Sequence, residues 1–173
     1  MRNGEQILLI RKGGIREEEG VFRIADQEFF LMPTWEHQNS RLLKPEYVAH
    51  LEHLQQTGHD PTQIVIDSYA IVTAIHHAKN EAQVQAVAHE CLWNNTYIKE
   101  RFDFNPYDPL YLLILRVYRL PQAQCLPMLP DYGGCKSWVT LDRQLDLTGA
   151  TPAIPDSEFQ TRSNAVVKTL EEA

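Results

Sequence analysis

A Gly-Gly turn near the start of the chain carries residues that are well suited to bind an anion. The turn, at Gly13 and Gly14, lies in the stretch "LLIRKGGIRE". Consecutive glycines allow positive φ angles and leave backbone N–H groups open, as a phosphate-binding nest requires. The flanking cations Arg11, Lys12 and Arg16 would add charge-assisted hydrogen bonds. The alternative is a hairpin turn with solvated charges, and no P-loop pattern (GxxxxGK followed by Ser or Thr) is present.

A second Gly-Gly turn, at Gly133 and Gly134 in "DYGGCKSW", repeats this arrangement late in the chain. It is followed by Lys136 and by Trp138, whose ring can stack on a base. We expect the two turns to meet at one mouth of a sheet and to bind an anionic group there. The competing interpretation is two unrelated turns whose cations lie in solvent.

The stretch "PTWEHQ" places a ring, a carboxylate and an imidazole next to one another, at Trp35, Glu36 and His37. These three side chains together can bind a nucleobase or transfer protons. The alternative is a loop in which Trp35 closes the end of the fold and His37 caps a carbonyl group. The pattern adds these residues to the candidate ligand site without assigning them a reaction.

No complete catalytic or metal-binding signature accompanies these residues. The three cysteines form no CxxC pair, and the HxxH pattern at His50 and His53 lacks a third ligand at a recognised spacing. We therefore expect no metal, no cofactor and no disulfide. An enzyme that acts on a phosphate-bearing substrate stays an alternative, with Glu17 or Glu36 as the acid–base group and Lys12 as the electrostatic group.

The composition is typical of a soluble globular protein. Of the 173 residues, 43% are hydrophobic and 23% are charged, and the net charge is −7. No apolar run reaches the roughly 18 residues that a membrane helix needs. The first residues, "MRNGEQ", lack the apolar core of a secretory signal, so we expect a cytoplasmic protein without a membrane partner. The negative charge disfavours general attraction to nucleic acid but leaves a local basic groove open.

The elements that would position these residues follow from periodicity and from turn residues. Short apolar or β-branched runs predict strands at 6–11, 21–32 (two strands joined near Asp26), 62–75, 109–121 and 136–141. Amphipathic stretches with capping residues predict helices over 44–56, from Asn80 to about residue 92, over 95–102, and after Pro155. Residues 121–135, rich in Pro and Gly, are predicted to form a long irregular loop.

This order predicts an α+β fold in a single domain, residues 1–173. The expected sheet is small, mixed or barrel-like, and is built from N-terminal and C-terminal strands with three to four helices. The runs 6–11 and 110–119 show no polar alternation, so each needs cover on two faces. We therefore expect both runs in the same sheet.

Four blocks, "ILLIRKGGIRE", "FFLMPTWEHQ", "PLYLLILRVYRL" and "YGGCKSWVTL", resemble a bacterial family catalogued as domain-of-unknown-function family 1802. The blocks occur in the same order, and the resemblance covers nearly the whole chain. It implies no particular catalytic residues. Members of that family also carry a short extra segment before "GEQILLIRKGG", which implies that this chain begins at an internal methionine or lacks an edge element.

A second resemblance concerns architecture. A strand that ends in basic residues near the start, with "LRVYRL" and "SWVTL" late, is similar to PUA-like barrels such as the ASCH and EVE domains. Those domains bind RNA, modified bases or nucleotides. The stretch "GEQILLIR" carries Gln6 where the ASCH pattern GxKxxExR has its Lys, so the resemblance is an analogy of fold.

These patterns favour a binding module that takes a nucleotide or a segment of RNA through its Gly-Gly turns. The enzyme described above is one alternative. A protein-interaction subunit without a small ligand is the other, and the acidic net charge favours it. The identity of a protein partner does not follow from the residues.

Overall fold

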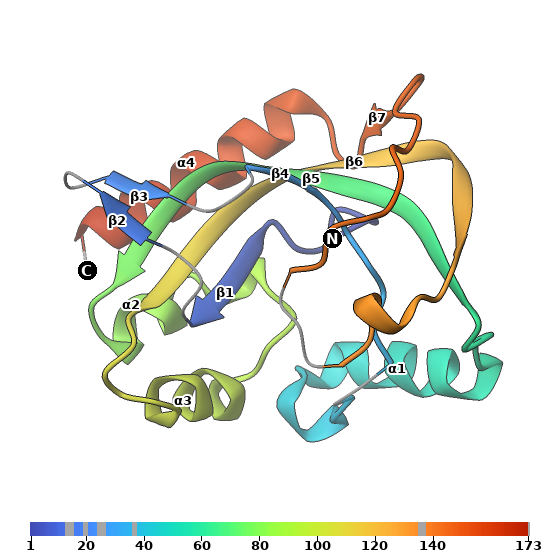
Figure 1. Ribbon diagram of the computed structural model, residues 1–173. Coiled ribbons are helices and arrows are strands. Elements are labelled where there is room, and N and C mark those ends of the chain that lie inside the picture. Colours follow the sequence, from blue (N-terminus) through green and yellow to red (C-terminus); the bar gives the residue numbers. More distant parts are fainter. Residues whose placement is uncertain (13–15, 19–20, 24–26, 36–37, 135–137, 173) are drawn as a thin grey trace.

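An antiparallel sheet of five strands forms the centre of an α+β fold (Figure 1). The computed structural model describes residues 1–12, 16–18, 21–23, 27–35, 38–134 and 138–172. Its strands are β1 (Leu8–Lys12), β2 (Arg16–Glu18), β3 (Val21–Arg23), β4 (Glu28–Phe30), β5 (Gln63–Ala78), β6 (Leu110–Pro127) and β7 (Thr151–Pro152). Its α-helices are α1 (Pro45–Thr57), α2 (Glu81–Ala86), α3 (Asn95–Asp103) and α4 (Asp156–Glu172). Short 3₁₀ helices are η1 (Ser40–Leu42), η2 (Ala88–Glu90) and η3 (Pro130–Tyr132).

The sheet has the strand order β1-β6-β5-β4, with β7 paired to β6, while β2 and β3 pair with each other. Strand β1 pairs with β6 in antiparallel register, from Leu8 opposite Ile114 to Lys12 opposite Leu110. The predicted placement of the first and the late strand in one sheet is therefore confirmed. The α+β class is confirmed as well, although the described sheet is open and antiparallel rather than mixed or barrel-like.

Strands β5 and β6 run side by side in a long arch (Figure 1) and exceed their predicted lengths. Residues 121–127 continue β6, so the loop predicted there is wrong. The register shifts between Ile66 opposite Gln124 and Ser68 opposite Arg119. Pro121 lies in this shift, where its missing N–H group costs no ladder hydrogen bond.

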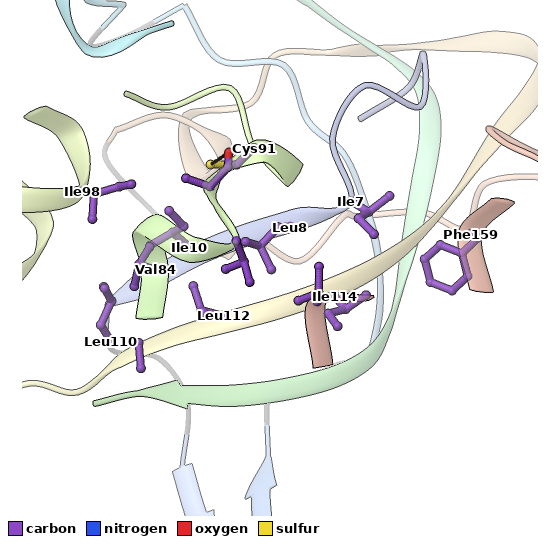
Figure 2. Close-up of a cluster of buried hydrophobic side chains, with 14 residues drawn as sticks. Ile7, Leu8, Ile10, Val84, Cys91, Ile98, Leu110, Leu112, Ile114 and Phe159 are labelled. Carbon is purple, nitrogen blue, oxygen red and sulfur yellow. Dashed lines mark hydrogen bonds between the residues drawn. The ribbon is translucent and has the colours of Figure 1, made fainter. Parts of the chain in front are cut away.

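Both faces of the sheet are covered, as the uninterrupted apolar runs require. On one face, Leu8 and Ile10 of β1 and Leu112 and Ile114 of β6 pack against Val84 of α2 (Figure 2). Side chains of α3 and α4 complete this cluster. The neighbouring residues of the same strands point to the other face, because side chains alternate along a strand. That second cluster contains Leu9, Phe29, Ala70, Leu113, Leu115 and Val117.

The helices begin close to their predicted positions, and α2 has the predicted cap, Asn80. Asn80 accepts a hydrogen bond from the Gln83 amide at the start of α2, and Asn94 caps α3 in the same way. Helix α2 ends at Ala86, earlier than predicted, and a 3₁₀ turn follows it. Four apolar residues of this segment are nevertheless buried: Val84, Val87, Ala88 and Cys91.

The strand predicted at 136–141 is wrong where the structure describes it, since residues 138–141 join no ladder. Val139 and Leu141 instead pack by their side chains against the far end of β5 and β6. The Tyr132 hydroxyl, which donates to the Asp142 carboxylate and accepts from the Asp142 amide at 2.8 Å each, fixes this segment. Apolar contacts and this tyrosine take the place of a backbone ladder.

Candidate functional site

A cavity of about 1190 Å³ lies beside the sheet face that carries Leu9 and Phe29. Its walls are β1, β4, the segment after β4, the first half of β5, and the segment 138–147. The lining is largely apolar, with a small number of charged and hydroxyl groups among the hydrophobic side chains. Such a pocket with a few convergent polar groups is the usual form of a small-molecule site.

Arg11 and Trp138, both predicted site residues, meet in the wall of this cavity. The Arg11 guanidinium carbon lies 5.4 Å from the centre of the Trp138 ring. The edge of Phe29 packs against the same ring, with 4.9 Å between centroids and an interplanar angle of 86°. Trp138 thus bridges the two edge strands, β1 and β4, at the mouth where the late Gly-Gly segment was expected to meet β1.

The electrostatics of Arg11 reflect its half-buried position. Desolvation lowers the pKa of its guanidinium, the nearby Arg101 lowers it further, and Tyr97 acts in the opposite direction. Among the described residues, Arg11 has no carboxylate partner. A partly desolvated cation is strongly attracted to an anionic ligand.

Lys12, the neighbouring predicted cation, does not join Arg11. Its ammonium group donates hydrogen bonds to the carbonyl oxygens of Arg101 and Phe102, each at 2.9 Å. The reason is strand alternation, which directs Arg11 to the cavity and Lys12 to the opposite face. Lys12 therefore caps the C-terminal end of α3, and its ammonium group is engaged there rather than at the cavity.

Trp35 does not join Trp138 either. Its ring stacks on His59, which follows α1, with 4.2 Å between centroids and 5° between the planes. The cavity lining reaches Pro33 and Thr34 but not Trp35 itself. Trp35 and Trp138, both predicted to stack on a base, therefore lie apart, and Phe29 is the ring that packs against Trp138.

The late Gly-Gly turn serves mainly to direct the chain. The Gly133 amide donates to the Pro130 carbonyl at 3.3 Å, so it is not an open donor, and Gly134 takes a φ of 83° that favours glycine. Neither glycine lines the cavity. Their turn precedes the segment that places Trp138.

The remaining predicted site residues lie wholly or partly outside the part of the chain that the structure describes. Three segments with such residues are not described, and they contain Gly13 and Gly14, Glu36 and His37, and Lys136. Arg16 and Glu17 belong to β2, where their backbones pair with Arg23 and Phe22 of β3.

A second polar group in the cavity escaped sequence reasoning. Asp67 forms an ion pair with Arg2 at 2.8 Å and accepts a hydrogen bond from the Ser68 hydroxyl at 2.9 Å. Asp67 stands at the shift in β5–β6 register, and such irregularities often redirect side chains next to sites. The sequence signal for Asp67 was the occurrence of an acidic residue within the apolar run "QIVIDSYAIV".

Metal and membrane features were searched over the described residues. No group of three His, Cys, Asp or Glu side chains among them is placed to hold a metal ion. In that same part of the chain, no helix is long and apolar enough to cross a bilayer.

Comparison with known proteins identifies the family to which the chain is similar. A family model described as "Domain of unknown function (DUF1802)" matches residues 1–165. This match confirms the resemblance carried by the four sequence blocks. No curated protein and no solved structure matches the chain, and the PUA-like resemblance gains no support.

Proposed function

The chain belongs to the family described as a domain of unknown function (DUF1802), and from its cavity we propose that it is a binding module for a nucleotide. The observation that carries this proposal is the guanidinium of Arg11 lying 5.4 Å from the Trp138 ring inside that cavity. A nucleotide offers a flat base and an anionic phosphate, which match an aromatic ring and a desolvated cation.

The size of the cavity and the charge of the chain favour a free nucleotide over a length of RNA. Its volume of about 1190 Å³ exceeds the roughly 300–1,000 Å³ of ordinary ligand sites, so a whole nucleotide and some water fit. A strand of RNA depends on many phosphate contacts and is repelled by a net charge of −7. A single phosphate needs only one local positive region.

The proposal is tested by calorimetric titration of the protein with a panel of ribonucleotides. We expect saturable binding of at least one of them. Replacing Arg11 by Ala should weaken that binding about tenfold or more, the size of a lost charge-assisted hydrogen bond. Arg41→Ala is the matched control, because Arg41 is exposed and pairs with Glu100 at 3.3 Å, away from the cavity lining.

Two outcomes would contradict the proposal. One is a panel in which no nucleotide binds the parent protein. The other is equal weakening by Arg11→Ala and Arg41→Ala, which would show that only the total charge matters.

A further inference from the structure

The segment 138–147 forms one wall of the cavity without belonging to the sheet. Trp138, Leu141 and Leu145 are among its cavity-lining residues. All of its residues are described, and none of them lies in a strand or helix or is fully buried. A segment without ladder hydrogen bonds or buried side chains opens at a lower free energy than the strands beside it. We call this segment the strap.

Two polar side chains from outside the strap hold its backbone in place. The Tyr132 hydroxyl donates to the Asp142 carboxylate and accepts from the Asp142 amide, at 2.8 Å each. The side-chain amide of Gln124, on β6, donates to the Asp146 carbonyl at 2.7 Å and accepts from the Asp146 amide at 3.2 Å. These two side chains do for the strap what a neighbouring strand does for a strand of a sheet.

Neither Tyr132 nor Gln124 lines the cavity. Tyr132 is only 2% exposed, so its ring belongs to the fixed core while its hydroxyl reaches the strap. Both residues can therefore act on a ligand in the cavity only by setting the position of the strap.

Glycines with positive φ angles precede and follow the strap. Gly134 has a φ of 83° and Gly149 has a φ of 77°. A Cβ atom at Gly134 would meet nothing within 4 Å, so the backbone conformation and not close packing favours glycine there. Positions of this kind absorb the changes in backbone angles that a hinged motion needs.

Opening of the strap would take the candidate site apart. Trp138 belongs to the strap, whereas Arg11 and Phe29 belong to β1 and β4. The 5.4 Å distance from the Arg11 guanidinium to the Trp138 ring, and the contact of Phe29 with the same ring, therefore depend on a closed strap.

We propose that the strap opens to admit the ligand and closes over it, and that Tyr132 is the positioning residue that latches it. The identity of the ligand rests on the proposed nucleotide-binding function. The opening is a property of the free protein and can be measured without a ligand. Closure would complete the site by bringing Trp138 to Arg11.

The test follows amide hydrogen exchange at Asp142 and Asp146 by nuclear magnetic resonance. If the strap opens as one unit, Tyr132→Phe should speed exchange at Asp146, which Tyr132 does not contact, about tenfold, the size of a lost hydrogen bond. Gln124→Ala should likewise speed exchange at Asp142. Exchange in β5 and β6 should not change in either variant. Tyr107→Phe is the matched control, because Tyr107 is 94% exposed and lies outside the cavity lining.

A faster exchange that stays confined to the amide whose own partner is removed would overturn the strap as a moving unit. So would an equal effect of Tyr132→Phe and Tyr107→Phe at Asp146.

The ligand arm adds each of the four ribonucleoside monophosphates in turn. We expect a nucleotide that binds by calorimetry to slow exchange at Asp142 and Asp146, and to dissociate about tenfold faster from Tyr132→Phe than from Tyr107→Phe. Binding that leaves both amides unchanged would contradict closure over the ligand. If no nucleotide binds, the proposed function fails, while coupled exchange at the two amides would still support the hinged strap.

Discussion

Two adjacent cations, Arg11 and Lys12, have opposite roles because they point to opposite faces of β1. Arg11 lines the cavity, while Lys12 donates to the last carbonyl groups of α3. The two residues were assigned to one site because they are neighbours in the sequence, but their side chains lie on opposite faces of the strand. Substitution of Arg11 therefore tests ligand binding, and substitution of Lys12 tests stability.

Lys12→Met should lower stability without affecting ligand affinity. The substitution keeps much of the aliphatic length and removes both hydrogen bonds to α3, a loss of about 1–3 kcal/mol in the free energy of unfolding. Urea unfolding measures this loss, and calorimetry measures nucleotide affinity in native buffer. A variant that keeps the parental stability but loses nucleotide affinity would show that Lys12 contributes to the ligand site.

His76 on β5 should make the fold sensitive to mild acid. Its buried Nε2 has no hydrogen-bond partner within the described part of the chain, and burial lowers its pKa, with Glu171 opposing this shift. The unfolded chain therefore takes up the proton first, so stability falls as pH drops below about 6.5 and levels off below the folded-state pKa.

The measurement compares the parent with His76→Leu in urea unfolding at pH 7.5 and at pH 5.5. The parent should lose more stability on acidification than the variant does, because all other titrating groups are shared. Equal losses in the two proteins would show that His76 does not contribute.

At the scale of elements, a buried ion pair connects α4 with the region around η2. Arg162 donates from Nε and Nη2 to the Glu90 Oε2 at 2.9 and 2.5 Å, and from Nη1 to the Gly4 carbonyl at 2.6 Å. Glu90 is only 5% exposed, so its carboxylate depends on this partner. The pair fixes α4 and the N-terminal segment relative to each other.

Arg162→Met should lower the free energy of unfolding by about 3–5 kcal/mol, because it leaves a buried carboxylate unpaired. Combining it with Glu90→Gln should recover part of that loss, since the remaining group is neutral. A double-mutant cycle in urea measures the coupling. Losses that simply add would mean that the two side chains do not interact in solution.

Elements were predictable wherever one local signal dominated. The apolar runs gave β1 and most of β6, and Asn80 marked the start of α2. The extension of β6 through residues 121–127 was not predictable, because prolines there normally indicate a loop and only the register shift against β5 accommodates Pro121. Long-range pairing overrode the local signal.

The site was predictable only in part for a similar reason. Arg11 and Trp138 were found from motifs, and they do meet. Phe29 was missed because its importance comes from a contact between segments that are distant in the sequence. Trp35 was grouped with Trp138 on residue type alone, whereas the fold stacks it on His59.

At the scale of the whole molecule, a negative chain carries a local positive region. The net charge of −7 coexists with the half-buried Arg11 and the Trp138 ring beside it. Such an arrangement limits general attraction to polyanions and keeps a short-range site for one phosphate. It is the charge distribution that the proposed binding of a small anionic ligand requires.

The most direct test of this account is the fluorescence of Trp138 during nucleotide titration. The chain has three tryptophans, so Trp35→Phe with Trp93→Phe leaves Trp138 as the sole emitter. We predict saturable quenching by a nucleotide, with the dissociation constant that calorimetry gives for the same protein, because the base stacks on that ring. A nucleotide that binds by calorimetry while Trp138 emission stays constant would contradict the account.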